Sequence, residues 1–93
     1  MAKSLKKYHV EFSLHAQKII EKLDTKIRAR IIEWIEKNLE GCENPRFQGK
    51  VLKGKFKGKW RYRVGDYRII VEIQDDKVVV LVVDVDKRND VYK

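Results

Sequence analysis

The sequence has few of the features that define secreted, disulfide-linked or membrane-spanning proteins. Cys42 is its only cysteine, which excludes an internal disulfide and a cysteine-cluster metal site. No apolar run approaches the roughly 20 residues that cross a bilayer. The first residues carry positive charge with no apolar stretch behind them, which is not the pattern of a signal peptide. We therefore expect a protein of the reducing cytoplasm that has no membrane partner.

Motifs for common cofactors and metals are absent as well. The sequence has no Walker-type phosphate loop and no dinucleotide fingerprint. His9 and His15 lack the neighbouring acidic pattern of a metal site, and a strand and a helix start suit them better. Ser13 is better interpreted as a helix cap than as a nucleophile, and Cys42 has no obvious activating partner. An enzyme with this sequence would work with Arg, Lys and Tyr, which points to phosphoryl chemistry.

The composition is that of a small, basic, globular domain. The 93 residues contain no repeat and no linker, so we expect one domain over residues 1–93. Hydrophobic residues make up 43% and charged residues 39% of the chain. The formal net charge of +8 would suit nucleic acid, an acidic protein or an anionic membrane surface as partner. The distribution of the charge has to decide between these partners and a merely solvated surface.

Hydrophobic periodicity predicts an α+β domain. A first strand is followed by two helices, which Ser13 and Asp24 cap, and Gly41 ends the second helix. The period then changes from 3.6 to 2, with turns at Gly65-Asp66 and Asp75-Asp76. We expect an N-terminal strand, two helices and a three-stranded antiparallel meander, which form a twisted sheet, antiparallel or mixed, with the helices packed on one face. The predicted strands cover residues 8–12, 60–64, 67–74 and 77–85.

Basic residues are concentrated before and within the predicted hairpin. Six of them occupy every second position: Lys53, Lys55, Lys57, Lys59, Arg61 and Arg63. Alternate residues of an extended chain share a face, so this row predicts a cationic ridge suited to a phosphate backbone. The alternative is a half-buried strand whose lysines are simply solvated.

The arginines of the hairpin are the stronger signal. If Gly65-Asp66 is a two-residue turn, Arg63 lies opposite Arg68, and like charges directly across a ladder are unfavourable. Converging guanidinium groups would make an anion site, because each presents a planar fork that matches phosphate oxygens. The alternative is neutralisation from neighbouring strands by Glu11, Glu72 or Asp84.

The end of the chain adds further candidates. Lys87 and Arg88 follow the last predicted strand, and Tyr92 comes shortly afterwards. A terminal Lys-Arg pair is usually only a solvated end. Together with the hairpin, these residues could supply another phosphate contact and an aromatic platform for a base.

Two stretches of sequence carry a family resemblance. The hairpin segment, residues 60–70, resembles the hairpin signature of the RelE/ParE toxin superfamily. The ending, residues 83–92, is similar to that of the RelE branch in particular, and length and element order agree over nearly the whole chain. The resemblance implies the toxin of a type II toxin–antitoxin system.

The RelE resemblance implies a specific reaction and specific partners. Such a toxin is a ribosome-dependent endoribonuclease (an mRNA interferase) that uses no metal and no cofactor. The 2′-hydroxyl attacks the adjacent phosphate, which leaves a 2′,3′-cyclic phosphate. Arg68 would stabilise the pentacoordinate phosphate, Arg88 would assist the leaving oxygen, and Tyr92 would stack on a base. The ribosome, mRNA and an acidic RelB-like antitoxin are the expected partners.

The sequence departs from the family in one respect. Members often carry lysines at the positions of Arg61 and Arg63, and a lysine can serve as a base, whereas arginine hardly ever loses its proton. Lys59 is the nearest alternative base, and the sequence leaves the base unassigned. A ParE-like inhibitor of DNA gyrase without nuclease activity is one competing interpretation, and a basic RNA-binding module that no longer cleaves is another. Arg88 and Tyr92 favour the RelE branch, because ParE-like members generally lack that pairing.

Overall fold

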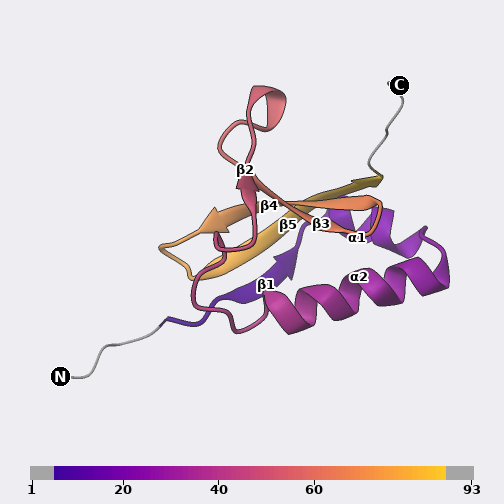
Figure 1. The fold of residues 1–93 in the computed structure, drawn as a ribbon, viewed down its shortest axis with the longest axis horizontal. Helices are drawn as coiled ribbons and strands as arrows, with labels where there is room; N and C mark the ends of the chain where they lie inside the picture. Colours follow the sequence, from indigo (N-terminus) through magenta and orange to yellow (C-terminus); the bar gives the residue numbers. More distant parts are fainter. Residues whose placement is uncertain (1–5, 88–93) are drawn as a thin grey trace.

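The computed structural model describes residues 6–87 of the chain. These residues form a mixed sheet with two helices on one face (Figure 1). Within these residues the sheet has five strands in the order β1-β5-β4-β3-β2. β1 runs parallel to β5, and the other neighbouring strands run antiparallel. The elements are β1 (His9–Phe12), α1 (Leu14–Glu21), α2 (Thr25–Asn38), β2 (Lys50–Val51), a short 3-10 helix η1 (Gly54–Phe56), β3 (Trp60–Val64), β4 (Tyr67–Gln74) and β5 (Val79–Lys87).

The predicted order of one strand, two helices and a meander is confirmed, and the sheet contains one strand that was not predicted. β2 is an additional short strand, and it pairs with the first two residues of β3. β1 is parallel to β5, so the sheet is mixed. A parallel pair needs a long crossover, and the helical hairpin together with the meander provides it.

Both predicted helix caps are present. The Ser13 hydroxyl accepts a hydrogen bond from the Ala16 amide at 3.0 Å, and an Asp24 carboxylate oxygen accepts one from Lys26 at 3.0 Å. These contacts satisfy amides at the helix starts that have no partner within the helix. Past the end of α2, Gly41 has a φ of +80°, the left-handed conformation that ends many helices.

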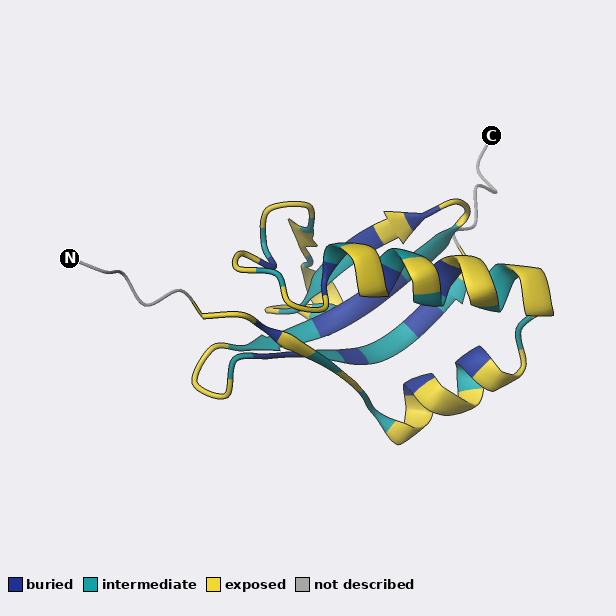
Figure 2. Cartoon of the chain, turned by 90° about the horizontal axis from the view of Figure 1, so that it is seen from below, coloured by how far each residue is buried: buried dark blue, intermediate teal, exposed yellow. Residues whose placement is uncertain are grey.

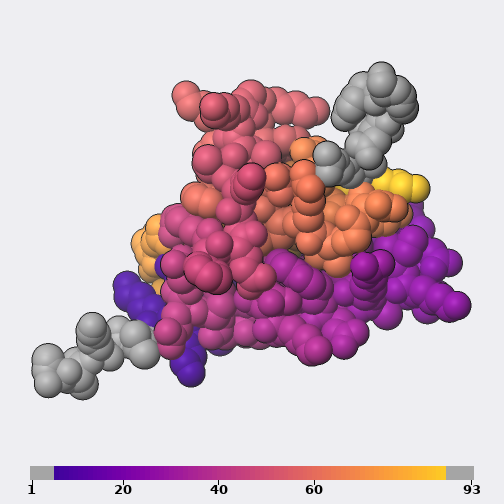
Figure 3. Space-filling view, viewed as in Figure 1, coloured from indigo at the N-terminus to yellow at the C-terminus, as the bar shows by residue number. Residues whose placement is uncertain are grey.

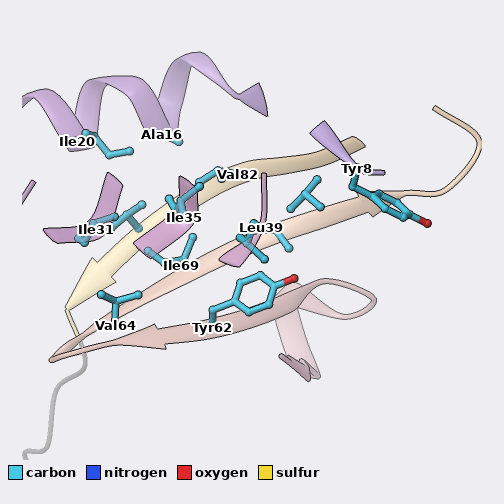
Figure 4. Packing of buried hydrophobic residues seen from close by; sticks show 13 residues of the cluster. Tyr8, Ala16, Ile20, Ile31, Ile35, Leu39, Tyr62, Val64, Ile69 and Val82 are labelled. Atoms are coloured by element: carbon cyan, nitrogen blue, oxygen red, sulfur yellow. The ribbon is translucent and has the colours of Figure 1, made fainter. Parts of the chain in front are cut away.

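The core lies between the helices and one face of the sheet. Helix α2 contributes Ile31 and Ile35, and Leu39 follows directly after it, each at most 2% exposed. Strand β3 contributes the fully buried Tyr62 (Figure 4). Both helices present their exposed residues away from the sheet (Figure 2). The Tyr62 hydroxyl donates to the Pro45 carbonyl, which satisfies this polar atom inside the core. No helix within the described residues is long and apolar enough to cross a bilayer.

The connection between β4 and β5 differs from the prediction. The predicted two-residue turn at Asp75-Asp76 is wrong, because four residues, 75–78, join Gln74 to Val79. The register then shifts between Ile70 and Val71, so that one residue of β5, Val83, has no partner in the ladder. Such a bulge reverses which side chains point to each face of the strand beyond it.

Candidate nucleic-acid interface

The β3–β4 hairpin has the predicted register. Val64 pairs with Tyr67 and Arg63 pairs with Arg68 across a two-residue turn. Gly65, the first turn residue, has a φ of +62°, as a Gly-first hairpin turn requires. The two like charges are therefore direct neighbours, as the sequence predicted.

The arginines of the hairpin lie on the side of the sheet away from the helices. Tyr62 and Val64 of β3 belong to the core, so their strand neighbours Arg61 and Arg63 point to the other side. Arg68 of β4 shares that side, because its register partner is Arg63. We call this face, opposite the helices, the arginine side. Arg63 is exposed, whereas Arg61 and Arg68 are half-buried. The fold thus brings together the three arginines predicted from the hairpin.

Asp86 holds the guanidinium of Arg68 in a fixed orientation. Arg68 Nε donates to one Asp86 oxygen at 2.9 Å, and Nη2 donates to the other at 2.8 Å. About a third of each side chain is exposed, at 31% for Arg68 and 37% for Asp86. The hydrogen bond with Asp86, more than any other contact, raises the pKa of Arg68 above its ordinary value. Sequence reasoning named Glu11, Glu72 and Asp84 as possible neutralising groups and missed Asp86.

The bulge in β5 explains why Asp86 reaches Arg68. Val80 and Val82 face the core before the bulge, and Val85 faces the core after it. An unbulged strand would direct Asp86 toward the helices. Because Val83 interrupts the alternation, Asp86 lies opposite Arg68 on the arginine side. The sequence does show aspartates, Asp84 and Asp86, after the valine run. Which face of the sheet they occupy could not be predicted, because it depends on the bulge at Val83.

The predicted cationic ridge is wrong for its first half. Residues 53–59 do not form an extended chain, because Gly54 and Gly58 have φ values of +72° and +86° and the backbone closes into the short helix η1. The Leu52 amide bonds back to the Lys59 carbonyl at 2.8 Å. Alternation therefore places only the strand residues Arg61 and Arg63 on one face.

The lysines of this segment are nevertheless on the arginine side of the sheet. The segment between β2 and β3 projects from the sheet, away from the helices (Figures 1 and 3). Lys53, Lys55 and Lys57 are exposed on this projection, and Lys59 is half-buried where the chain enters β3. We call residues 52–59 the basic projection. It adds positive charge beside the hairpin without forming a straight row.

A clamp that sequence reasoning missed fixes the loop before β2. Arg46 donates to both oxygens of Asp75 at 3.1 and 2.8 Å, and the Tyr8 hydroxyl donates to Asp75 at 2.7 Å. The Arg46 guanidinium also lies 5.7 Å from the centre of the Trp60 ring. The Arg46 hydrogen bond is the main cause that lowers the Asp75 pKa, and the Asp75 hydrogen bond raises the Tyr8 pKa. No local pattern could reveal partners that are 29 and 67 residues apart.

The remaining predicted residues lie at the end of β5 and beyond it. Lys87 is exposed and pairs in register with Tyr67, directly after the hairpin turn. Arg88 and Tyr92 lie outside the described residues. The described part of the site therefore consists of Arg61, Arg63 and Arg68, with Lys87 at the same end of the sheet.

The described residues are suited to binding anions. Among residues 6–87, no group of three His, Cys, Asp or Glu side chains is placed to hold a metal ion. Burial raises the pKa of the Cys42 thiol, which keeps it protonated and unreactive. A guanidinium has five N–H donors, and Asp86 uses two of those on Arg68. The three that remain can donate to a phosphate.

The sequence matches a known family over most of its length. Residues 10–92 match the family described as ParE toxin of the type II toxin–antitoxin system. Toxin RelG of Mycobacterium tuberculosis is 31% identical over 86 residues, which cover 92% of this chain and 97% of RelG. Toxin RelE of the same organism is 30% identical, covering 92% of this chain and 87% of that toxin.

Solved structures have the same fold. A chain of the toxin–antitoxin complex RelBE2 from M. tuberculosis superposes with a TM-score of 0.80 at 29% identity, covering 96% of this chain and all of that chain. The isolated RelE toxin of Escherichia coli has a TM-score of 0.72 at 26% identity, with 91% of this chain and 88% of that chain covered. Fold and sequence together define a toxin of a type II toxin–antitoxin system. The chain belongs to the ParE toxin family, within the RelE/ParE superfamily, and its named relatives are of the RelE type.

Proposed function

We propose that this toxin is a ribosome-dependent mRNA endoribonuclease that cleaves without a metal or a cofactor. The observation that carries the proposal is the pairing of Arg68 with Asp86 on the open face of the sheet. The pair orients a permanently charged, planar donor toward solvent, beside Arg61 and Arg63. The RelE names of the relatives support an RNA target.

The oriented guanidinium provides the main catalytic contribution in this proposal. When the 2′-hydroxyl attacks the phosphate, negative charge builds up on the non-bridging oxygens. Donors that already point at those oxygens stabilise this charge without reorganising, which is commonly the largest catalytic effect. Arg68 has that role, and Arg61 and Arg63 hold the neighbouring phosphates. The basic projection contributes Lys53, Lys55, Lys57 and Lys59 as further phosphate contacts.

Arg88, Tyr92 and Lys87 complete the proposed site on the basis of the sequence. Arg88 assists the leaving oxygen, Tyr92 stacks on a base, and Lys87 binds the RNA backbone. The register places Lys87 beside Tyr67, at the hairpin end of the sheet, which is consistent with these roles.

An antitoxin completes the proposed system. Solved neighbours include complexes of RelE with RelB from E. coli and from Pyrococcus horikoshii. A net charge of +8 favours an acidic partner, so we propose a RelB-like acidic antitoxin. We also propose that the toxin acts in the cytoplasm, where ribosomes and mRNA are found. A small gene for an acidic protein beside the toxin gene would support this pairing.

Cleavage of mRNA on programmed ribosomes tests the proposal. Wild-type protein should cut the message in the A site and leave a 2′,3′-cyclic phosphate, while Arg68→Ala and Arg88→Ala should abolish cutting and toxicity. Arg28→Ala, a change of the same kind on α2, is the matched control and should remain toxic. If Arg68→Ala and Arg88→Ala both stay fully toxic, the phosphate site is wrongly assigned.

Inhibition of DNA gyrase is the second candidate, and the ParE description of the matched family favours it. A supercoiling assay with the same variants distinguishes the two activities. Intact message together with blocked supercoiling by wild-type protein would replace the nuclease by the gyrase inhibitor. Cleaved message with unaffected supercoiling would exclude the gyrase inhibitor.

A further inference from the structure

A polar cavity lies on the other side of the hairpin, between α2 and the end of β3. It has a volume of about 370 Å³, and both elements contribute to its lining. β2 pairs only with Trp60 and Arg61, so the rest of β3 forms an open edge of the sheet next to α2. The Arg63 side chain lines the cavity at this edge.

The cavity lining is positively charged. Arg30 and Lys37 of α2 and Arg63 of β3 line it, and Glu33 is the acidic residue among the lining side chains. Glu33 lies 3.9 Å from Lys37, an i,i+4 pair on the exposed face of the helix. Within residues 6–87, Arg30 and Arg63 have no hydrogen bond or ion pair with another side chain, in contrast to Arg46 and Arg68. Two guanidinium groups therefore line the cavity with their donors available to an anion.

The position of Arg30 depends on the hairpin turn. A Cβ atom on Gly65 would lie 3.1 Å from Arg30 Nη1 and 3.2 Å from its Cζ. The absence of a side chain at Gly65 therefore lets the guanidinium lie against the turn backbone. The same glycine allows the turn and makes room for the arginine at the cavity.

The cavity also contains an aromatic surface. Trp34 lines it and is only half-buried, and its ring centre lies 5.5 Å from that of the buried Tyr62. Tyr62 supports the indole from the core side. Asn38, one turn further along α2, also lines the cavity, where its side-chain amide donates to the Trp34 carbonyl at 2.9 Å and its oxygen accepts from Gln48 at 3.3 Å. A planar aromatic ring beside cationic groups is the combination that binds a base together with its phosphate.

We propose that this cavity binds one nucleotide unit of single-stranded RNA, with the phosphate held by Arg30 and Arg63 and the base stacked on Trp34. The choice of RNA as ligand rests on the proposed function; the cavity and its chemistry do not. The cavity lies on the helical side of β3, whereas Arg68 lies on the opposite face, so the nucleotide bound here is distinct from the one that is cut at Arg68. Arg63, on the open edge of β3, borders both sites. The toxin would thus hold RNA at two places on either side of β3.

Tryptophan fluorescence of the full chain tests the proposal directly. Trp60→Phe leaves Trp34 as the remaining indole, since the sequence has two tryptophans. The ligand is a short RNA with 2′-O-methyl groups throughout, which removes the attacking hydroxyl and prevents cleavage. Adenosine monophosphate and inorganic phosphate are titrated separately. We expect the RNA and the nucleotide to quench Trp34, and phosphate to compete more weakly than the nucleotide.

Matched arginine variants separate specific binding from general charge. Arg30→Gln and Arg63→Gln should each weaken the quenching equilibrium at least about tenfold, because each removes charge-assisted hydrogen bonds to the phosphate. Arg28→Gln makes the same charge change on α2 but outside the cavity lining, and should change the affinity less than about twofold. Arg30 and Arg63 are both exposed, so neither replacement should alter folding. Because Arg63 also belongs to the proposed phosphate site, its variant is compared on the quenching of Trp34 by adenosine monophosphate, which reports on the cavity.

Several outcomes would overturn the inference. Equal losses for Arg28→Gln and Arg30→Gln would show only general electrostatic attraction. An unresponsive Trp34, or phosphate that competes as well as the nucleotide, would remove the base from the cavity. Failure here with intact mRNA cleavage would leave the proposed function standing. Binding here by a protein that cuts no message would retain the cavity and reject the nuclease.

Discussion

At the scale of single residues, Asp86 determines how Arg68 can act. The carboxylate uses Nε and Nη2 of the guanidinium and leaves the far edge for an anion. It also places a negative charge close to the phosphate that Arg68 should bind. Asp86 therefore favours catalysis by orienting the guanidinium, but it weakens the attraction between Arg68 and the phosphate.

Replacing Asp86 separates these two effects. In Asp86→Asn the guanidinium loses its fixed orientation, so the single-turnover cleavage rate should fall at least about tenfold. Affinity for programmed ribosomes should be unchanged or higher, because a negative charge near the RNA is removed. Asp84→Asn is the matched control on the same side of the sheet and should cleave as the wild type does. Equal cleavage by both variants would contradict the orienting role.

Gly65 should tolerate a side chain less well than Gly41. Both have positive φ, +62° and +80°, so alanine at either position should cost about 1 to 2 kcal/mol of unfolding free energy. A Cβ at Gly41 meets no atom within 4 Å, whereas one at Gly65 meets Arg30. Urea denaturation should show the larger loss for Gly65→Ala, and Arg30→Ala should remove the excess. If the excess persists in the double variant, Arg30 is not its cause.

At the scale of elements, the sequence correctly predicts the features that depend on residues close to one another in the chain. Ser13 and Asp24 cap the two helices, and the Gly65-Asp66 turn fixes the register that makes Arg63 face Arg68. Each of these features depends on residues a few positions apart. Residues 77–85 are apolar on both faces, which is typical of a central strand, and β5 does lie between β1 and β4, although its bounds are shifted.

The partner of Arg68 could not be predicted in the same way. The first half of β5 is a run of valines and leucine, so no alternation fixes its register or reveals the bulge at Val83. The prediction of an extended cationic ridge over residues 53–59 is wrong for a related reason. The alternating lysines fit a strand, but Gly54 and Gly58 turn the backbone back on itself.

The Arg46–Asp75 clamp should make stability depend on acid pH. The Asp75 pKa is lowered below its ordinary value of 3.8. The contribution of the clamp is therefore complete above that value and is lost as the pH falls through the lower folded-state pKa. Asp75→Asn should cost about 0.5 to 1 kcal/mol at neutral pH, because the pair is largely exposed.

Thermal melts over a pH series check this sign. The difference between wild type and Asp75→Asn should shrink as the pH drops below 3.8. Glu33→Gln is a control that removes a carboxylate from an exposed helical pair of longer distance, 3.9 Å. A difference that grows toward acid pH would mean that Asp75 is not stabilised in its charged form.

At the scale of the whole molecule, the charge is divided between the two sides of the sheet. The side away from the helices carries Arg61, Arg68 and the basic projection, and the helical side carries the cavity with Arg30. Arg63, on the open edge of β3, borders both sides. A net charge of +8 attracts RNA to either side without regard to sequence. Only contacts made in the complex release counterions, so the salt dependence of binding identifies which side is used.

Two triple variants with the same charge change distinguish the sides. In the first variant, Gln replaces three lysines of the basic projection, Lys53, Lys55 and Lys57. This should reduce the slope of log affinity for RNA against log salt by about 2, since each phosphate contact contributes about 0.7. Lys18, Lys22 and Lys26 are also exposed and belong to the helical layer. Their replacement by Gln should leave the slope nearly unchanged. Both slopes are measured on ribosomes at several potassium concentrations. If the variant of the basic projection leaves the slope unchanged, Lys53, Lys55 and Lys57 make no direct contact with RNA phosphates. Equal reductions by the two variants would mean that RNA contacts the helical layer as well.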